Sequence, residues 1–291
     1  MMRFCFVVLH YKTAEDTIEC IKSIHNLEDE SFIVVVDNAS NNGSIEKVEE
    51  FFQGYNNIHV IKNERNLGFA EGNNVGFDYA KNKINSEFIA VLNNDIIIRD
   101  EKFIKKIEQL YDNTKFDLAG PDIESLADHG HQNPILNTVM SIKDVDKEIL
   151  RYSILKIINR TGLYDKIKRG KSVRKNKPTE KTQKQMINVT LHGAFVIFSK
   201  NYIDNEKYCF RAGTFLYMEE AILYRYCMLR NYKTVYNPSV TVYHKEDSST
   251  SSLFLASRDK RDFIFSNMIK SLRVYKKILM NEGEATNEER L

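Results

Sequence analysis

The chain has 291 residues, of which 42% are hydrophobic and 28% are charged, enough to bury a core as one large domain or two small ones. The formal net charge is only +2, which gives no basis for general nucleic-acid binding and confines any electrostatic function to a local site. No apolar run approaches the roughly 18 residues of a membrane-spanning helix, and four widely spaced cysteines indicate reduced thiols in the cytoplasm, without a disulfide framework or a zinc site.

The first 120 residues alternate apolar strands with helices. The opening MMRFCFVVLH has a short apolar run without a cleavage-site pattern, so we expect a strand over 3–10 and no signal peptide. Further strands are predicted over 31–38, 57–63 and 87–95, and helical spacing of apolar residues is present over 14–24, 72–80 and 103–111. Thr13 and Asp16 are predicted to form a capping box. Because the strands are continuously apolar, we expect a mostly parallel sheet covered by helices on both faces.

The pattern loosens after residue 123 and becomes regular again near residue 187. A helix is predicted over 145–160, followed by a basic stretch over 166–184. Then come a strand over 187–199, a helix over 219–231, a strand over 234–244 and a basic amphipathic helix over 258–280. We find no internal repeat and no low-complexity tract.

Polar residues gather where the predicted strands end. They are His10, Tyr11, Lys12, Asp37, Asn38, Asn93, Asn94, Asp95 and His244. Each group alone is compatible with a turn or a cap, but ligands of open parallel sheets bind at the carboxyl ends of the strands, so together they predict a site. The chain lacks the glycine patterns of dinucleotide-binding folds and of P-loop enzymes. A nucleotide-type pocket remains, with Asp37 placed to accept from a base N–H and Asp95 placed to hold a hard cation on phosphate oxygens.

Seven stretches, in order, resemble the motifs of inverting family-2 glycosyltransferases with the GT-A fold, closest to the rhamnosyltransferase-like branch. They are VVLHYK, IVVVDNASNNGS, NERNLGFAEGNNVG, LNNDIII, LHGAFVIFS, FLYMEEAILYRY and YHKEDSST, and the resemblance covers about residues 3–265. It implies a GT-A, Rossmann-like α/β fold with a C-terminal helical extension. It further implies a cytoplasmic enzyme that moves a sugar from a dTDP- or UDP-sugar, dTDP-rhamnose being one candidate, to an acceptor hydroxyl with inversion.

The same resemblance divides the chain. Residues 1–120 would form the nucleotide-sugar-binding half and 121–250 the acceptor-binding half of one domain, with an insertion at about 133–185. Residues 251–291 would form a C-terminal amphipathic helical segment.

The resemblance also assigns residues to the donor and to a metal. The donor set is His10, Tyr11, Lys12, Asp37, Asn38, Asn66, Asn93 and Asp95. Lys12 departs from the family, which usually has Asn there. Asp95 takes the place of the metal-binding Asp of the family's Asp-x-Asp and His244 that of a metal-binding His, which implies a divalent cation, Mn²⁺ or Mg²⁺, on the departing diphosphate.

The catalytic base is assigned in the same way. Glu219 and Glu220 open a predicted helix where the family has Glu-Asp, so Glu220 is expected to deprotonate the acceptor, with one methylene more than the family's Asp. Acids are also favoured at helix N-termini by the dipole alone. Gly193 and Ala194 match a small-residue turn beside the acceptor, whereas His192 has no firm counterpart.

The basic segments leave two uses open. The run over 166–184 holds nine Lys or Arg against Glu180 and is either a solvated loop or, with the helix over 258–280, a contact with anionic membrane. The apolar stripe of that helix could equally pack on the catalytic domain. A glycan or a lipid-diphosphate-linked acceptor at the inner face of the plasma membrane suits the membrane interpretation. No aromatic residue interleaves with the basic run, so nucleic acid is not expected as a partner.

Two other functions compete with this one. A sugar nucleotidyltransferase would need a glycine-rich loop after the first strand, and residues 13–24 contain no glycine. A non-catalytic sugar-nucleotide-binding partner in a polysaccharide assembly complex stays open because Glu220 replaces the family's Asp. The sequence leaves the sugar, the acceptor, the linkage and the oligomeric state undetermined.

Overall fold

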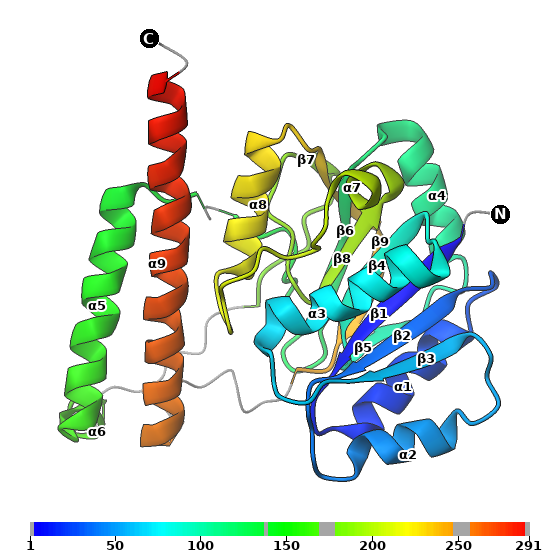
Figure 1. The fold of residues 1–291 in the computed structure, drawn as a ribbon, viewed down its shortest axis with the longest axis horizontal. Coiled ribbons are helices and arrows are strands. Elements are labelled where there is room, and N and C mark those ends of the chain that lie inside the picture. Colours follow the sequence, from blue (N-terminus) through cyan, green and yellow to red (C-terminus); the bar gives the residue numbers. More distant parts are fainter. Residues whose placement is uncertain (1–2, 137–138, 169–177, 247–256, 289–291) are drawn as a thin grey trace.

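The computed structural model describes residues 3–136, 139–168, 178–246 and 257–288, and the central feature of this part is a nine-stranded sheet. The strand order is β3-β2-β1-β4-β8-β6-β9-β5, and β7 pairs with β9 outside this path. The first four strands in this order run parallel (Figure 1). They are β1 Phe4–His10, β2 Phe32–Asp37, β3 Ile58–Lys62 and β4 Phe88–Asn93. The strands predicted over 3–10, 31–38, 57–63 and 87–95 are thus confirmed.

The other half of the sheet is mixed. Its strands are β5 Ile96–Ile98, β6 Leu118–Ser125, β7 Met186–Ile187, β8 Phe195–Ser199 and β9 Thr234–His244. β8 lies antiparallel between β4 and β6, whereas β6 and β9 are parallel. The single strand predicted over 187–199 is wrong, because it is divided into β7 and β8. Asn188 adopts a positive φ of 56°, which ends β7, and a turn at Gly193–Ala194 precedes β8.

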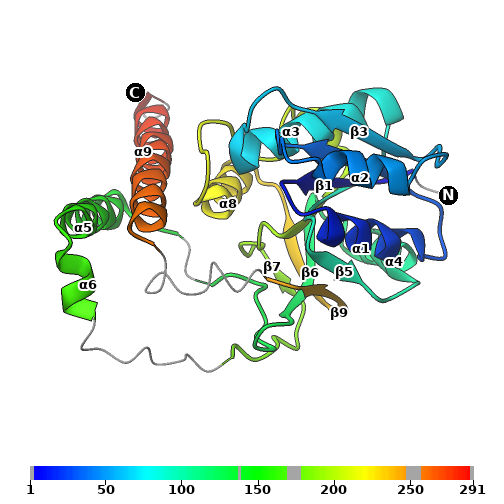
Figure 2. The ribbon, with the colours of Figure 1, turned by 90° about the horizontal axis from the view of Figure 1, so that it is seen from below.

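Helices cover both faces of the sheet and explain the continuous apolar strands (Figures 1 and 2). They are α1 Ala14–His25, α2 Ser44–Phe51, α3 Gly68–Tyr79 with the π-turn η1 Ala80–Ile84, α4 Phe103–Thr114 and α7 Lys200–Asn205. Along β1, Phe4 and Phe6 belong to the core cluster that contains residues of α1 and α4, while Cys5 and Val7 belong to the cluster that contains residues of α3. The predicted α/β fold is confirmed.

The predicted capping box at the start of α1 is wrong. Thr13 is the N-cap residue, but its side chain makes no cap hydrogen bond. Instead, Thr13 Oγ1 accepts a hydrogen bond from Asn94 Nδ2 at 2.8 Å, and Asp16 Oδ1 accepts one from Lys245 Nζ at 2.5 Å. Both side chains therefore tie α1 to the segments that follow β4 and β9, which are distant in the sequence.

A group of helices extends from one end of the sheet (Figures 1 and 2). It comprises α5 Ile142–Arg160, α6 Leu163–Lys168 and α9 Arg258–Glu288. Val145 of α5, Ala221 and Ile222 of α8 Glu219–Leu229, and Leu272 and Tyr275 of α9 share one apolar cluster. The helices predicted over 145–160, 219–231 and 258–280 are confirmed. No helix among the residues described is long and apolar enough to cross a membrane.

Part of the predicted basic segment, residues 169–177, and the end of the YHKEDSST motif, residues 247–250, lie outside the described residues.

Candidate active site

The strand ends that carry the predicted site residues meet at one edge of the sheet. In the parallel register, His10 lies beside Asp37 and Leu9 lies beside Asn93. The antiparallel pairing of β5 with β9 places Ile96 beside His244. The Asn93 N–H donates to the carbonyl oxygen of Ala194 at 3.0 Å, so the turn before β8 joins the same edge.

Asp37 sits at the end of β2 on a support of buried polar groups. Its Oδ1 accepts hydrogen bonds from the Ser40 N–H at 3.2 Å and from Ser40 Oγ at 2.5 Å. His10 is fully buried, with Nδ1 at 2.6 Å from Thr17 Oγ1 and Nε2 at 2.8 Å from Ser44 Oγ. Burial lowers the pKa of His10, and the neighbouring carboxylate of Asp37 opposes this shift. His10 therefore lies beneath Asp37 as a support, rather than at a surface where a ligand could touch it.

The remaining donor residues divide into exposed and structural ones. Tyr11 and Lys12 are exposed, and the Lys12 N–H donates to Ser40 Oγ at 2.8 Å. Asn38 is buried, and its Nδ2 donates to Asn66 Oδ1 and to the Gly68 carbonyl, each at 3.0 Å. Asn38 thereby holds the loop that carries Asn66 beside the end of β2.

Asp95 and His244 form a close pair with an unusual geometry. Asp95 Oδ1 lies 3.1 Å from His244 Nε2, yet this oxygen is buried and accepts no hydrogen bond. The two atoms are near enough for an ion pair but are not aligned for a hydrogen bond. An unsatisfied carboxylate oxygen is costly in the absence of a cation, and here it faces an imidazole nitrogen.

A chain of hydrogen bonds fixes which nitrogen of His244 carries the proton. Gln132 Nε2 donates to Glu246 Oε1, because a carboxylate accepts only. Gln132 Oε1 is therefore turned toward His244 Nδ1, 2.8 Å away, which must donate. In the neutral imidazole, Nε2 then keeps its lone pair, and it lies 3.1 Å from Asp95 Oδ1. Ser125 Oγ donates to the second oxygen of Glu246 at 3.1 Å and completes the chain.

This pair fits a divalent cation that also binds phosphate. Carboxylate oxygen and imidazole nitrogen suit Mn²⁺ at least as well as Mg²⁺, and a second hydrogen bond behind the imidazole is the usual support of a histidine ligand. Among the described residues, no group of three or more His, Cys, Asp or Glu side chains could hold a metal ion by itself. The donor diphosphate and water would have to supply the other ligands.

Glu220 faces this site across the turn before β8. The Gly193 N–H donates to Glu220 Oε1 at 3.3 Å. A Cβ atom on residue 193 would lie 2.9 Å from that oxygen, so any other residue there would require the glutamate carboxylate to shift.

His192 completes the arrangement and was not assigned a role from the sequence. Its Nδ1 accepts from the Ala194 N–H at 3.1 Å, and its ring centroid lies 6.3 Å from that of His244. Burial lowers the pKa of His192, and the carboxylate of Glu220 opposes this shift. In the neutral ring the proton is therefore on Nε2. The sequence feature that could have identified His192 is its position directly before the Gly193–Ala194 turn and the fully buried strand β8.

Glu219 has different surroundings from Glu220. It is 5% exposed, and its Oε1 atom is buried without a hydrogen-bond partner. Burial raises the pKa of Glu219 to about 7, and repulsion from Glu220 acts in the same direction. Of the two adjacent carboxylates, Glu220 is the one in contact with the turn at residue 193.

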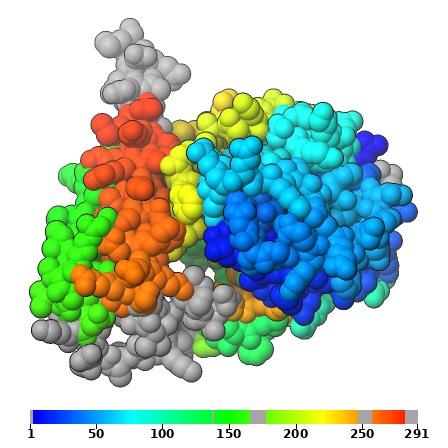
Figure 3. Space-filling view, turned by 60° about the horizontal axis from the view of Figure 1, so that its bottom comes forward, coloured from blue at the N-terminus to red at the C-terminus, as the bar shows by residue number. Residues whose placement is uncertain are grey.

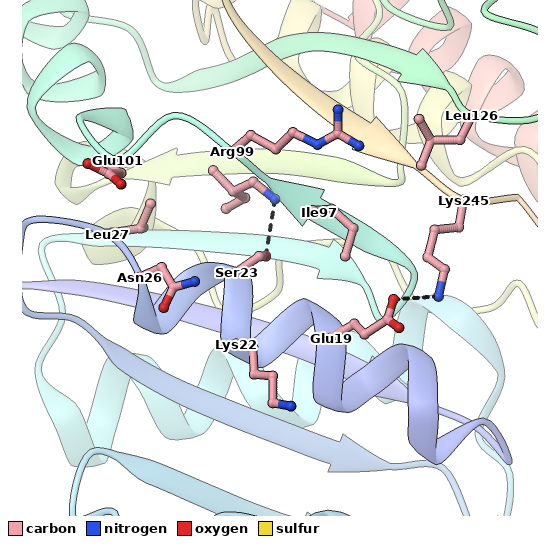
Figure 4. Close-up of a pocket in the computed structure, with 11 residues that line it drawn as sticks. Glu19, Lys22, Ser23, Asn26, Leu27, Ile97, Arg99, Glu101, Leu126 and Lys245 are labelled. Atoms are coloured by element: carbon pink, nitrogen blue, oxygen red, sulfur yellow. Dashed lines mark hydrogen bonds and ion pairs between the residues drawn. The ribbon is translucent and has the colours of Figure 1, made fainter.

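Two cavities lie near the sheet edge. One of about 550 Å³ is lined by His192, Gln132, Glu246 and parts of residues 128–136 and 178–182. It therefore reaches the hydrogen-bond chain behind His244. The other, of about 500 Å³, lies between α1 and β5 and contains none of the predicted site residues (Figure 4). Its Lys245 donates to Glu19 at 2.8 Å as well as to Asp16, so its charge is already balanced.

The fold is that of GT-A glycosyltransferases. The model of the family described as Glycosyl transferase family 2 matches residues 5–204, and the chain belongs to this family.

Three curated relatives are similar to part of the chain. An uncharacterized glycosyltransferase of Methanocaldococcus jannaschii is 32% identical over 46% of this chain and 44% of its own length. A low-salt glycan biosynthesis hexosyltransferase of Haloferax volcanii is 29% identical over 40% of this chain and 35% of its own. A dTDP-rhamnosyl transferase of Shigella flexneri is 34% identical over 38% of this chain and 35% of its own. The matched region is thus less than half the length of each relative.

Solved structures share the fold at low sequence identity. S. aureus TarS 1–349 in complex with UDP-GlcNAc has a TM-score of 0.54 at 16% identity, covering 93% of this chain and 72% of that one. A mannosyltransferase from Pyrobaculum calidifontis in complex with GDP-Man and Mn²⁺ has a TM-score of 0.54 at 12% identity, covering 85% of this chain and 58% of that one.

Proposed function

We propose that this chain is an inverting, metal-dependent glycosyltransferase. It takes a hexosyl or deoxyhexosyl group from a dTDP- or UDP-sugar and transfers it to a hydroxyl of a glycan or a lipid-diphosphate-linked acceptor in cell-surface polysaccharide synthesis. The observation that carries this proposal is the convergence of Asp37, the Asp95–His244 pair and Glu220 on one edge of the sheet. The similar dTDP-rhamnosyl transferase supports a deoxythymidine donor, and the TarS complex supports a uridine donor.

The donor nucleotide binds at the end of β2. Asp37 presents a carboxylate whose orientation is held by Ser40, and it accepts a hydrogen bond from the N–H of a pyrimidine base. Asn66 is held beside the end of β2 by its bond to Asn38, and the exposed Tyr11 and Lys12 directly follow the neighbouring strand β1. His10 contributes from the interior by linking the end of β1 to Thr17 of α1 and Ser44 of α2.

The diphosphate lies at the ends of β4 and β9. Asp95 Oδ1 and His244 Nε2 would hold the cation, which when bound supplies Lewis-acid stabilisation of the departing diphosphate. Asn93 places an amide rather than a second carboxylate there, so the bound diphosphate must contribute much of the negative charge that retains the cation. Gln132 keeps the His244 ring in the orientation and tautomer that this task requires.

Glu220 acts as the general base on the acceptor hydroxyl. Inversion requires the acceptor oxygen to attack opposite the diphosphate and to lose its proton as the new bond forms. The Gly193 N–H orients the carboxylate toward the site, and Ala194 completes the small turn beside the acceptor. His192 is a poor alternative base, because its Nδ1 accepts from the Ala194 N–H and its Nε2 carries the proton.

A panel of dTDP-, UDP- and GDP-sugars tests this function without knowledge of the acceptor. Donor hydrolysis and calorimetric affinity would be measured with Mn²⁺ for the natural chain and for Asp37→Ala. A preference for pyrimidine donors is expected, and the loss of one charge-assisted hydrogen bond should weaken binding by about 1–3 kcal/mol in the variant. Unchanged affinity in Asp37→Ala, or no binding of any donor, would contradict the proposal.

A further inference from the structure

The apolar stripe that the sequence assigned to membrane contact is largely used elsewhere. Of the stripe on α9, Ile264, Leu272 and Tyr275 are 7%, 2% and 0% exposed. Ile264 shares a cluster with Phe265 and Tyr164, and the other two pack with Val145 of α5 and with α8. Ile264, Leu272 and Tyr275 of this stripe therefore pack within the chain, against α5, α6 and α8, whereas Phe263 of the same stripe is 46% exposed.

The outer face of α5, in contrast to most of the stripe of α9, carries apolar side chains that are exposed. Leu150, Ile154 and Ile157 are 62%, 48% and 63% exposed, and their spacing of four and three residues places them on one face of the helix. The other side of α5 buries Val145 and Asn159, and Asn159 Nδ2 donates to the Arg258 carbonyl of α9 at 2.9 Å. Figure 3 shows α5 and α9 side by side at one end of the molecule, so the outer face of α5 points away from the sheet.

Basic side chains share this face. Lys143, Lys147 and Arg151 recur every four residues and are all exposed, and this spacing places them alongside the three apolar side chains. Residues 142–160 and 258–277 together contain twelve Lys or Arg against five Asp or Glu, although the whole chain has a net charge of only +2. These two segments carry a net charge of +7, and the basic stretch over 166–184, with nine Lys or Arg against Glu180, carries +8, so the rest of the chain is net acidic.

We propose that the α5 outer surface, defined by Lys143, Lys147, Leu150, Arg151, Ile154 and Ile157, docks the chain on an anionic lipid bilayer. An interfacial helix binds by burying an apolar stripe at the headgroup boundary while flanking Lys and Arg are attracted to anionic lipid. Three apolar side chains are a small contact compared with the roughly 800 Å² per partner that a stable dimer buries. The charge and the size of the surface thus favour a bilayer over a second copy of the chain.

The α5 outer surface lies on the same side of the molecule as α8, the helix that carries Glu220, so docking would affect where the acceptor side of the site lies (Figure 1). Ala221 and Ile222, directly after Glu220, share an apolar cluster with α5 and α9. Docking through α5 would hold the acceptor side of the site near the bilayer, where a lipid-linked acceptor resides. Only this consequence rests on the proposed function; the binding of lipid by α5 does not.

Vesicle co-sedimentation of the full chain tests the docking. Phosphatidylglycerol–phosphatidylcholine vesicles should bind the natural chain, and pure phosphatidylcholine vesicles should bind it weakly. One variant combines Leu150→Ser, Ile154→Ser and Ile157→Ser, and another combines Lys143→Gln, Lys147→Gln and Arg151→Gln. Each should reduce the partition coefficient by at least about tenfold.

Matched controls separate docking from folding and catalysis. Phe51→Ser on α2 removes an apolar side chain that is 48% exposed, and Lys102→Gln with Lys105→Gln removes two exposed charges at α4; both should bind vesicles normally. All variants should keep the circular dichroism spectrum and the UDP affinity of the natural chain. The proposal would be overturned if both α5 variants bound vesicles as strongly as the natural chain, or if the natural chain did not bind vesicles. It would also be overturned if light scattering showed a dimer that the apolar variant abolishes while vesicle binding is absent.

Discussion

The backbone N–H of Gly193 donates to Glu220 Oε1 at 3.3 Å, and this contact joins the turn before β8 to the first turn of α8. A side chain at residue 193 would occupy the space of the carboxylate, since its Cβ would lie 2.9 Å from that oxygen. The glutamate, one methylene longer than aspartate, is thus matched by a missing side chain on the facing turn.

Gly193→Ala should displace Glu220 and reduce sugar transfer by about 10–100-fold, because a small misplacement of a catalytic group is costly. Donor affinity should stay unchanged, since the expected contact of Asp37 with the base does not involve residue 193. Adding Glu220→Asp in the same chain shortens the carboxylate and should recover part of the loss. Full transfer by Gly193→Ala alone would show that the position of Glu220 is not critical.

Replacing the two adjacent carboxylates one at a time should separate their roles. Glu220→Gln keeps the size of the side chain but removes its basicity, so transfer should fall by roughly 10²–10⁴ while donor binding is retained. Glu219→Gln should preserve transfer. The reverse pattern would exchange the two roles, and full transfer by both variants would place the base elsewhere.

Glu219 should make stability depend on pH. Its pKa rises from 4.5 to about 7 on burial, so the folded chain holds a proton that the unfolded chain releases more readily. The stability gained from this bound proton is complete below the unfolded pKa of Glu219 and is lost as pH rises through about 7; its upper limit is on the order of 3 kcal/mol.

Urea unfolding at about pH 5 and about pH 8 measures this effect. The free energy of unfolding should fall with pH more steeply in the natural chain than in Glu219→Gln. Equal pH dependence in the two chains would mean that Glu219 does not titrate in this range.

Gln132 should control metal affinity without touching the metal. Gln132→Leu removes the acceptor that holds the proton on His244 Nδ1, so Mn²⁺ affinity in the presence of UDP should fall by about 10–100-fold. The exposed Gln109 on α4 offers a matched control, Gln109→Leu, which should bind Mn²⁺ normally. Calorimetry would detect the difference, and equal Mn²⁺ affinity in both variants would remove Gln132 from this role.

The sequence predicted the parts of the fold that depend on local pattern. Continuous apolar runs identified β1 to β4, because both faces of these strands are covered. Local pattern did not reveal the insertion of antiparallel β8 between β4 and β6, since strand order depends on long-range pairing. The short helix α2 was also missed, because it has only eight residues and begins within NNGS, a sequence typical of a turn.

In the site too, local pattern indicated some residues, whereas others depend on contacts that are distant in the sequence. Asp37, Asp95 and His244 were proposed from the sequence because each ends or follows an apolar strand and matches a family motif. Gln132 and Glu246 were not found, because their roles arise from contacts across 112 and 114 residues of sequence. The capping box failed for a related reason, since tertiary partners took both side chains.

The most direct test of the account is the calorimetric affinity of UDP and dTDP in Mn²⁺ and in excess EDTA, for the natural chain and for Asp95→Asn. The account places the donor diphosphate against a cation held by Asp95 and His244. Nucleotide affinity should therefore depend on Mn²⁺ in the natural chain, and most of that dependence should be lost in Asp95→Asn. Equal affinity in Mn²⁺ and EDTA, or an unchanged Mn²⁺ dependence in Asp95→Asn, would contradict a metal-dependent transferase site at this edge of the sheet.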